Sequence, residues 1–213
     1  MGPTLPVDFQ VAEPAMGLRG RFVVLEGIDG CGKSTQLEAL RTWLPGSGLL
    51  APGAELVVTR EPGGTALGSA LRQLLLHPPG EAAPEPMAEL LLYAADRAQH
   101  VEQLIRPALA AGHWVLSDRF SGSTAAYQGY GRGLSLELID QLTLVATGGL
   151  QPDLTVLLEI PLEESLRRRG HRTADRIEAA GEAYGVYWNA PYVPFFMKRF
   201  EVHVPVKKAK TLP

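Results

Sequence analysis

The sequence has a single cysteine in 213 residues, no long apolar run and no excess of positive charge. One cysteine excludes a disulfide within the chain and a zinc site built from cysteines. No apolar run approaches the roughly 20 residues that a membrane-spanning helix requires, and the first residues lack the basic start and apolar core of a secretory signal. We therefore expect a cytoplasmic protein with no membrane partner.

The charges nearly balance, with 20 Lys and Arg against 23 Asp and Glu and a net charge of −3. Proteins that bind the phosphate backbone of DNA or RNA usually carry a clear positive excess. We therefore expect no nucleic-acid partner, whereas a small phosphorylated substrate needs only a local cluster of cations. The chain is 46% hydrophobic, which is enough for the core of one large domain.

The chain is organised around one glycine-rich stretch. An apolar run at 22–25 leads into residues 27–34, which have the spacing G-x-x-x-x-G-K-S of a phosphate-binding loop. Glycines let successive backbone N–H groups point into one concavity, and the following helix directs its positive end at the same anion. Lys33 can reach the β- and γ-phosphates of a nucleotide, and the hydroxyl of Ser34 can bind Mg²⁺.

Strand and helix patterns alternate along the chain. Strands are expected at about 21–26, 55–59, 114–117 and 154–160, and helices at about 33–43, 66–76, 86–111, 135–147 and from 162 onward. This order predicts the α/β class, as a P-loop NTPase-type three-layer α/β/α domain with a parallel central sheet, within residues 20–183. Residues 1–19 are expected to form a flexible leader, and the glycine density of 121–133 predicts an irregular backbone.

Two polar residues stand where predicted strands end, which is where ligands bind in open α/β sheets. Arg60 can bind a phosphate there, or it can pair with a neighbouring carboxylate. Asp118 beside a phosphate-binding loop suits a Mg²⁺ ligand or a partner to a water of that ion.

Two further groups of side chains remain open to a functional or an ordinary interpretation. Tyr93, Arg97 and His100 share one helix face, so the ring and the guanidinium can bind a base or can form a solvated pair. Five arginines lie within residues 167–176. They form either a solvated basic helix end or a mobile lid that supplies cations to transferring phosphates.

Six motifs, in order over about residues 20–180, together resemble thymidylate kinase of the bacterial type. They are LEGIDGCGKSTQ (25–36), TREPGGT (59–65), ELLLYAADRAQH (89–100), LSDRF (116–120), STAAYQGYGRGL (123–134) and DRIE (175–178). The resemblance implies Mg²⁺-dependent transfer of the ATP γ-phosphate to dTMP, in a homodimer. The alternatives are a kinase of another nucleoside monophosphate and a nucleotide-binding member without turnover.

The resemblance also implies roles for individual residues. The ATP phosphates would be bound by Gly27, Ile28, Asp29, Gly30, Cys31, Gly32, Lys33, Ser34 and Thr35. The dTMP would be bound by Asp29, Arg60, Tyr93, Arg97, Arg119, Tyr127 and Gln128. The catalytic residues would be Lys33, Asp29 and Arg119, with one or more lid arginines from Arg167, Arg169 and Arg172; the metal would be held by Ser34 and Asp118.

The resemblance ends near Ala183, and the lid is expected at about 163–182. Residues 184–200 hold seven of the fifteen aromatic residues of the chain, so the composition changes abruptly. Val202–Val204 is a weak strand candidate. The segment 184–213 is either divergent yet functional or an altered end that leaves a sheet edge uncovered, and we favour the second.

Overall fold

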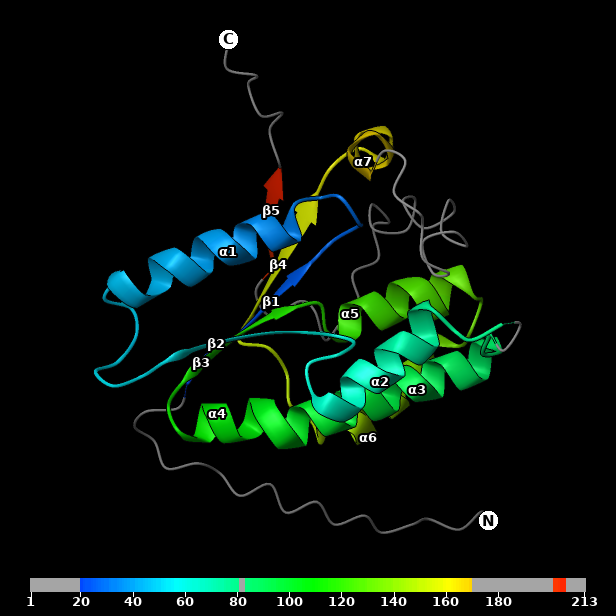
Figure 1. Ribbon diagram of the computed structural model, residues 1–213, viewed down its shortest axis with the longest axis horizontal. Coiled ribbons are helices and arrows are strands. Elements are labelled where there is room, and N and C mark those ends of the chain that lie inside the picture. The colour runs from blue at the N-terminus through cyan, green and yellow to red at the C-terminus, as the bar shows by residue number, and fades with distance from the viewer. Residues whose placement is uncertain (1–19, 81–82, 170–200, 206–213) are drawn as a thin grey trace.

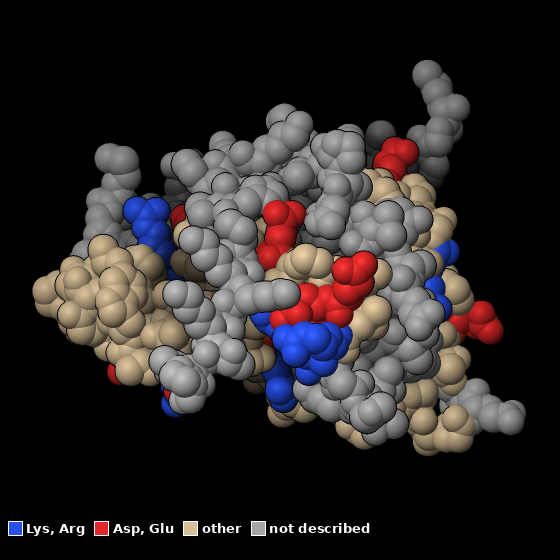
Figure 2. All heavy atoms as spheres, turned by 90° about the horizontal axis from the view of Figure 1, so that it is seen from above, with Lys and Arg blue, Asp and Glu red and all other residues tan. Residues whose placement is uncertain are grey.

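The computed structural model describes residues 20–80, 83–169 and 201–205. The expected leader at 1–19, the lid beyond residue 169 and most of the segment 184–213 therefore lie outside the described residues. Along the described residues, no helix combines the length and the apolar character that crossing a membrane requires. Charges of both signs lie next to one another on the face shown in Figure 2, in keeping with the small net charge.

The described residues form a sheet of five parallel strands in the order β2-β3-β1-β4-β5. The strands are β1 (Phe22–Glu26), β2 (Leu56–Arg60), β3 (Trp114–Asp118), β4 (Leu154–Glu159) and β5 (Glu201–Pro205). The first four agree with the predicted strands to within one or two residues. The predicted α/β fold class is confirmed.

Helices cover both faces of this sheet, with α1 on one side and α2 to α6 on the other (Figure 1). The helices are α1 (Lys33–Trp43), α2 (Ala66–Leu76), α3 (Pro86–His100), α4 (Arg106–Ala110), α5 (Ser121–Thr124), α6 (Leu136–Thr147) and α7 (Leu162–Arg169). A 3-10 turn, η1 (Leu44–Gly46), and two π-helical segments, η2 (Val101–Ile105) and η3 (Ala125–Gly131), complete the set. The long helix expected at 86–111 is thus α3, η2 and α4 in series.

Local sequence explains how α2 and α3 begin. The side chain of Thr65 accepts a hydrogen bond from Gly68 N at the start of α2, so Thr65 is the N-cap of this helix. Pro86 occupies the first turn of α3, where its missing N–H leaves no intrahelical bond unmade. These caps fix the starts of the two helices that carry Arg72, Tyr93 and Arg97.

The core lies in two layers, because successive strand residues point to opposite faces of the sheet. Phe22 and Val24 of β1 pack with Val101 and Ile105 of η2 on one face. Leu25 packs on the other face, in the layer that is completed by α1. The same strand therefore anchors both helical layers and holds the glycine-rich loop that follows it.

The carboxyl ends of the central strands meet at one edge of the sheet. Asp118 of β3 lies in register with Leu25 of β1 on one side and with Arg60 of β2 on the other. Glu61, Arg119 and the loop after Glu26 therefore leave the sheet side by side. This edge is where the fold can assemble a site from segments far apart in the sequence.

The expected irregular backbone at 121–133 is wrong, because α5 and η3 make residues 121–131 helical. Gly129 has a packing reason instead. A Cβ at Gly129 would lie 2.6 Å from Cδ2 of Leu136, so the glycine permits close contact between η3 and α6.

The C-terminal segment also differs from the interpretation we favoured. Residues 201–205 form β5, which pairs in parallel with β4 from Thr155 to Glu159. The edge of β4 is therefore covered by the divergent end of the chain, and the weak strand candidate at 202–204 is confirmed.

Candidate active site

The loop between β1 and α1 takes backbone conformations that favour glycine. Gly27, Gly30 and Gly32 have φ angles of 140°, 77° and 105°. At Gly27 a Cβ would also lie 2.5 Å from the backbone oxygen of Leu158. Such a loop ahead of a helix N-terminus turns backbone N–H groups toward an anion.

Lys33 is the first residue of α1, and its side chain folds back onto this loop. Its Nζ donates hydrogen bonds to the carbonyl oxygens of Gly27 (3.0 Å) and Ile28 (3.1 Å), and it lies 3.8 Å from Asp29 Oδ1. Burial, with the charge of Arg119, holds the pKa of Lys33 below its usual value. Its ammonium is thus held at the concave side of the loop.

Asp29 connects the loop to the end of β3. Its Oδ1 accepts a hydrogen bond from Nη2 of Arg119 at 2.6 Å, and its Oδ2 accepts one from the hydroxyl of Tyr127 at 3.3 Å. Burial acts to raise the pKa of Asp29, but the charges of Arg119 and Lys33 outweigh it and leave the pKa below its usual value. The carboxylate is therefore kept ionised between two cations.

Arg119 is held in place from both sides. Its φ of 72° is in the left-handed region, and its Nη1 donates to Gly27 O (3.1 Å) and to Ser123 Oγ (2.9 Å). The buried Glu26 supports the same turn, because its carboxylate accepts hydrogen bonds from Phe120 N (2.9 Å) and Ser123 Oγ (2.7 Å). The guanidinium consequently has a fixed place between the loop and α5.

Glu61 organises a second buried group of charges. It accepts a hydrogen bond from Arg97 Nε at 2.9 Å and lies 2.9 Å from Nδ1 of His100. Arg97 Nη2 also donates to Thr124 Oγ1 at 2.8 Å. Arg97 and His100 thus use the helix face that the sequence predicted, and Arg97 is bound on several sides and not exposed to solvent.

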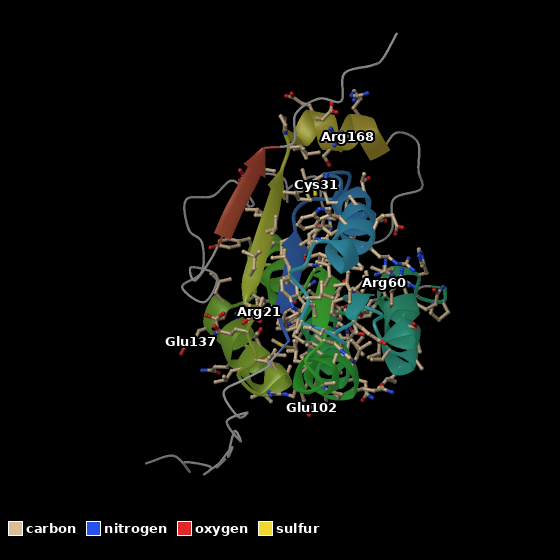
Figure 3. All side chains as sticks on the ribbon, turned by 90° about the vertical axis from the view of Figure 1, so that its left-hand side faces the viewer. Arg21, Cys31, Arg60, Glu102, Glu137 and Arg168 are labelled. Atoms are coloured by element: carbon tan, nitrogen blue, oxygen red, sulfur yellow. The ribbon has the colours of Figure 1, made fainter. Side chains whose placement is uncertain are left out.

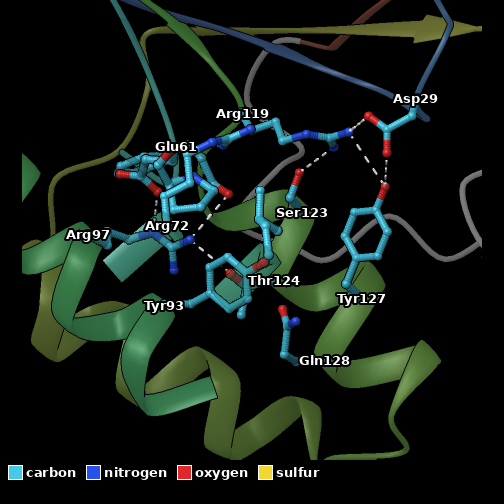
Figure 4. Close-up of a pocket in the computed structure, with 13 residues that line it drawn as sticks. Asp29, Glu61, Arg72, Tyr93, Arg97, Arg119, Ser123, Thr124, Tyr127 and Gln128 are labelled. Carbon is cyan, nitrogen blue, oxygen red and sulfur yellow. Dashed lines mark hydrogen bonds and ion pairs between the residues drawn. The ribbon is translucent and has the colours of Figure 1, made fainter. Parts of the chain in front are cut away.

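These groups surround one pocket (Figure 4). Six of the seven predicted acceptor-binding residues line it, namely Asp29, Tyr93, Arg97, Arg119, Tyr127 and Gln128. The residues come from the glycine-rich loop, α3, the end of β3 and η3. Their arrangement places two aromatic rings, an amide, a carboxylate and two guanidinium groups around a space that adjoins the phosphate-binding loop.

Comparisons with known proteins assign the chain to a family. A family profile described as thymidylate kinase matches residues 25–184. The chain is 73% identical over 164 residues to a thymidylate kinase of Prochlorococcus marinus (strain MIT 9313), covering 77% of this chain and 76% of that protein. It is 69% identical over 167 residues to one of Parasynechococcus marenigrum (strain WH8102), covering 78% and 80%.

A solved structure agrees with this match. The crystal structure of a thymidylate kinase from Ehrlichia chaffeensis aligns over 90% of each chain with a TM-score of 0.65 and 30% identity. The chain belongs to the thymidylate kinase family. It is therefore a nucleoside monophosphate kinase, and nothing in these comparisons supports either alternative function.

The lining of the pocket differs from the prediction at two arginines. Arg72, which was not predicted, lines the pocket, whereas Arg60, which was predicted, does not. Arg60 lies at the end of β2 as expected, but it is exposed and outside the pocket lining. Arg72 of α2 lines the pocket, and its Nη1 donates to Pro62 O at 3.0 Å. The signal was available, because Arg72 is the one charged residue in the apolar stretch 66–76.

The predicted metal-binding oxygens belong to Asp118, the last residue of β3, and to Ser34, the second residue of α1. Asp118 Oδ1 is buried and has no hydrogen-bond partner among residues 20–80, 83–169 and 201–205. Ser34 is exposed in the first turn of α1. A carboxylate oxygen without a partner among the described residues and a hydroxyl are hard donors of the kind that Mg²⁺ prefers, so these residues fit the Mg²⁺ that the resemblance implies.

The lid arginines are only partly within the described residues. Arg167 donates to both carboxylate oxygens of Glu164 (2.8 and 2.7 Å). Arg168, which we had not proposed, donates to the same carboxylate at 2.8 Å and to Gly30 O at 3.4 Å. Figure 3 shows Arg168 on the side of the molecule where Cys31 of the loop lies. Arg169 ends α7, and Arg172 lies outside the described residues.

Proposed function

We propose that the pocket holds dTMP and that residues 27–35 hold the phosphates of ATP, so that the γ-phosphoryl group passes directly to the acceptor. The observation that carries this proposal is the 2.6 Å hydrogen bond between Arg119 Nη2 and Asp29 Oδ1. It joins the phosphate-binding loop to the acceptor pocket. ATP bound to the loop and dTMP bound in the pocket would therefore meet at this pair of residues.

The base of dTMP is assigned to the inner part of the pocket. The ring of Tyr93 provides a face on which thymine stacks. Nε and Nη2 of Arg97 are bonded to protein acceptors, and Nη1 has no hydrogen-bond partner among the described residues, which leaves it to donate to a carbonyl oxygen of the base. Gln128 contacts the edge of the same base from η3.

The sugar and phosphate of dTMP are assigned to the part nearer the loop. Asp29 accepts a hydrogen bond from the 3′-hydroxyl, and Tyr127 occupies the space that a 2′-hydroxyl would need. Arg119 binds the 5′-phosphate, and Arg60 adds an exposed cation at the neighbouring strand end. The positive charge of Arg119 attracts the phosphate, while its Nη1 and Nη2 keep their hydrogen bonds to Gly27 O, Ser123 Oγ and Asp29 Oδ1.

The transfer needs no covalent intermediate. An oxygen of the dTMP phosphate attacks the γ-phosphorus in line, and both reactants are anions. Lys33, the loop N–H groups and Arg119 offset the repulsion and stabilise the charge that spreads over the transferring group. A phosphate acceptor is already ionised at neutral pH, so the reaction requires no strong general base.

Magnesium is the proposed cofactor. Ser34 and Asp118 would hold it, and the bound ion would supply positive charge beside the phosphates of ATP. Among lid residues, we propose Arg168 as a further source of positive charge beside Arg167, Arg169 and Arg172, because it already reaches the loop at Gly30 O.

The homodimer expected for the family has a structural basis in exposed apolar side chains. Met87 and Leu91 of α3 and Leu144 and Val145 of α6 are exposed, and α3 packs beside α6. Burial of these side chains against a second copy would stabilise a dimer. The proposed substrates of the enzyme, ATP and dTMP, are consistent with a location in the cytoplasm.

The proposal is tested by measuring ADP release with ATP, Mg²⁺ and one acceptor at a time from dTMP, dUMP, AMP, GMP and CMP. We expect turnover to be fastest with dTMP and to be lost in Lys33→Ala. A folded protein that binds ATP yet turns over none of these acceptors, or one that prefers another acceptor, would overturn the proposal.

A further inference from the structure

Gln128 is held by a buried carboxylate on a neighbouring helix. Its Nε2 donates a hydrogen bond to Oε1 of Glu89 at 2.8 Å, from η3 to α3. Both residues are almost fully buried, with Glu89 0% and Gln128 1% exposed. Arg132 pairs with the same carboxylate, through Nε to Oε1 (3.4 Å) and Nη2 to Oε2 (3.2 Å).

This contact determines which end of the amide faces Glu89. A carboxylate paired with a guanidinium offers only acceptor atoms, so the amide must present its NH₂ group to Glu89. The other end, Oε1, then points away from Glu89. Oε1 has no hydrogen-bond partner among the described residues, and Gln128 lines the acceptor pocket (Figure 4).

The pocket therefore presents an acceptor at Gln128 and a donor at Arg97, whose Nη1 is the nitrogen without a partner among the described residues. Thymine carries a complementary pair on one edge, with N3–H as donor beside O4 as acceptor. Cytosine carries the opposite pair, with N3 as acceptor beside an amino group as donor. The orientation of one amide thus distinguishes the two bases.

We propose that Glu89 is a specificity-determining positioning residue, which fixes the Gln128 amide with its oxygen toward the base and thereby selects thymine and uracil against cytosine. The proposal rests on the placement of dTMP in this pocket proposed above. It goes beyond that placement, because Glu89 is outside the pocket lining and acts through Gln128.

The substitution Glu89→Gln tests this orientation. Arg132 donates to both oxygens of Glu89, more closely to Oε2 (3.2 Å) than to Oε1 (3.4 Å), so we expect the remaining oxygen at the Oε2 position and the new NH₂ group toward Gln128. The Gln128 amide then reverses, because its oxygen can accept a hydrogen bond from the new NH₂ group. This reversal turns the NH₂ group of Gln128 toward the base. The reversed amide could donate to N3 of cytosine, so cytosine would no longer be selected against at this position. N3–H of thymine would instead face another donor, the NH₂ group of Gln128.

The measurement compares dTMP with 5-methyl-dCMP, because these acceptors share the methyl group, sugar and phosphate and differ at the base edge alone. We expect Glu89→Gln to lower the ratio of kcat/KM for dTMP to that for 5-methyl-dCMP by about tenfold, the value of one hydrogen bond, with the KM for ATP unchanged. A ratio is independent of the fraction of folded enzyme, so a loss of packing alone does not change it.

Two control variants separate this inference from the proposed function. Glu137→Gln makes the same chemical change at an exposed position of α6, and we expect the wild-type ratio. Gln128→Leu should lower kcat/KM for dTMP; if it does not, the base lies elsewhere and the proposed placement fails. If Gln128→Leu has its effect but Glu89→Gln lowers kcat/KM equally for both acceptors, Glu89 is only a structural anchor and the inference is overturned.

Discussion

The carboxylate of Glu61 holds Arg97 through a hydrogen bond of 2.9 Å between Oε2 and Nε. Both side chains are buried, with 4% and 3% exposed. Glu61 follows the end of β2, and Arg97 lies on α3, so the bond ties the sheet edge to the helix that carries Tyr93 and Arg97, the residues proposed to bind the base. The guanidinium is thereby oriented before any ligand binds, so binding does not have to include the entropy cost of ordering this side chain.

Glu61→Gln removes the negative charge from this buried pair. Because it leaves a buried guanidinium uncompensated, we expect the free energy of unfolding to fall by about 3 kcal/mol and the KM for dTMP to rise. Urea denaturation and initial rates measure the two effects. In the double variant Glu61→Gln/Arg97→Met the uncompensated charge is gone, so the stability should recover in part while the activity stays low. A double variant less stable than Glu61→Gln would contradict this account.

Arg119→Lys tests the fork of donors that joins the loop to the pocket. Nη1 and Nη2 together bind Gly27 O, Ser123 Oγ and Asp29 Oδ1, and a single ammonium cannot reproduce that geometry. We expect kcat to fall about 100-fold, the usual effect of losing one preorganised charge-stabilising donor. The control is Arg21→Lys at the exposed pair with Asp153, which should keep the wild-type kcat. Wild-type kcat in Arg119→Lys would remove Arg119 from the mechanism.

Tyr127 allows its ring and its hydroxyl to be tested separately. The ring is proposed to occupy the space of a 2′-hydroxyl, whereas the hydroxyl donates to Asp29 Oδ2 at 3.3 Å. We expect Tyr127→Phe to keep the preference for dTMP over the corresponding ribonucleotide, and Tyr127→Ala to lower that preference by about tenfold or more. Steady-state kcat/KM for both acceptors gives the result. Equal preference in the alanine variant and the wild type would mean that the sugar lies elsewhere.

Much of the fold was predictable because the relevant patterns are local. Apolar runs mark β1 to β4, and the glycine and lysine spacing marks the loop at 27–34. A strand end can also be recognised from the sequence, which is why Asp118 was expected at the site, whereas Arg119 was expected from the resemblance. Parallel order in an α/β sheet then brings those ends together.

Other features depend on contacts between segments far apart in the chain. Nothing near Glu89 in the sequence indicates that it meets Gln128 and Arg132, which lie 39 and 43 residues later. Likewise, the glycines of 121–133 suggested an irregular backbone, whereas Gly129 serves the contact of η3 with Leu136. Such roles are defined by the partner that packs against the residue, and no local pattern encodes that partner.

Asp96 introduces a pH dependence of stability. Its Oδ1 accepts a hydrogen bond from Gly63 N at 3.1 Å, but its Oδ2 is buried without a partner among the described residues. Burial, reinforced by the neighbouring charge of Glu61, raises the pKa of Asp96 to about 6. The folded pKa exceeds the unfolded value of about 3.9, so the folded state holds a proton that the unfolded state has lost. The resulting stabilisation is complete at low pH and is lost as the pH rises through about 6.

Asp96→Asn should remove this dependence, since its amide oxygen can still accept from Gly63 N while no charge is buried at any pH. We expect the free energy of unfolding of the variant, relative to the wild type, to be about 1 kcal/mol more favourable at pH 7.5 than at pH 5. Urea denaturation at the two pH values measures it, with Glu137→Gln on the exposed face of α6 as the control that should show no such change. An equal difference at both pH values would mean that Asp96 is already ionised at pH 5, and that Glu61, Arg97 and His100 together accommodate its charge.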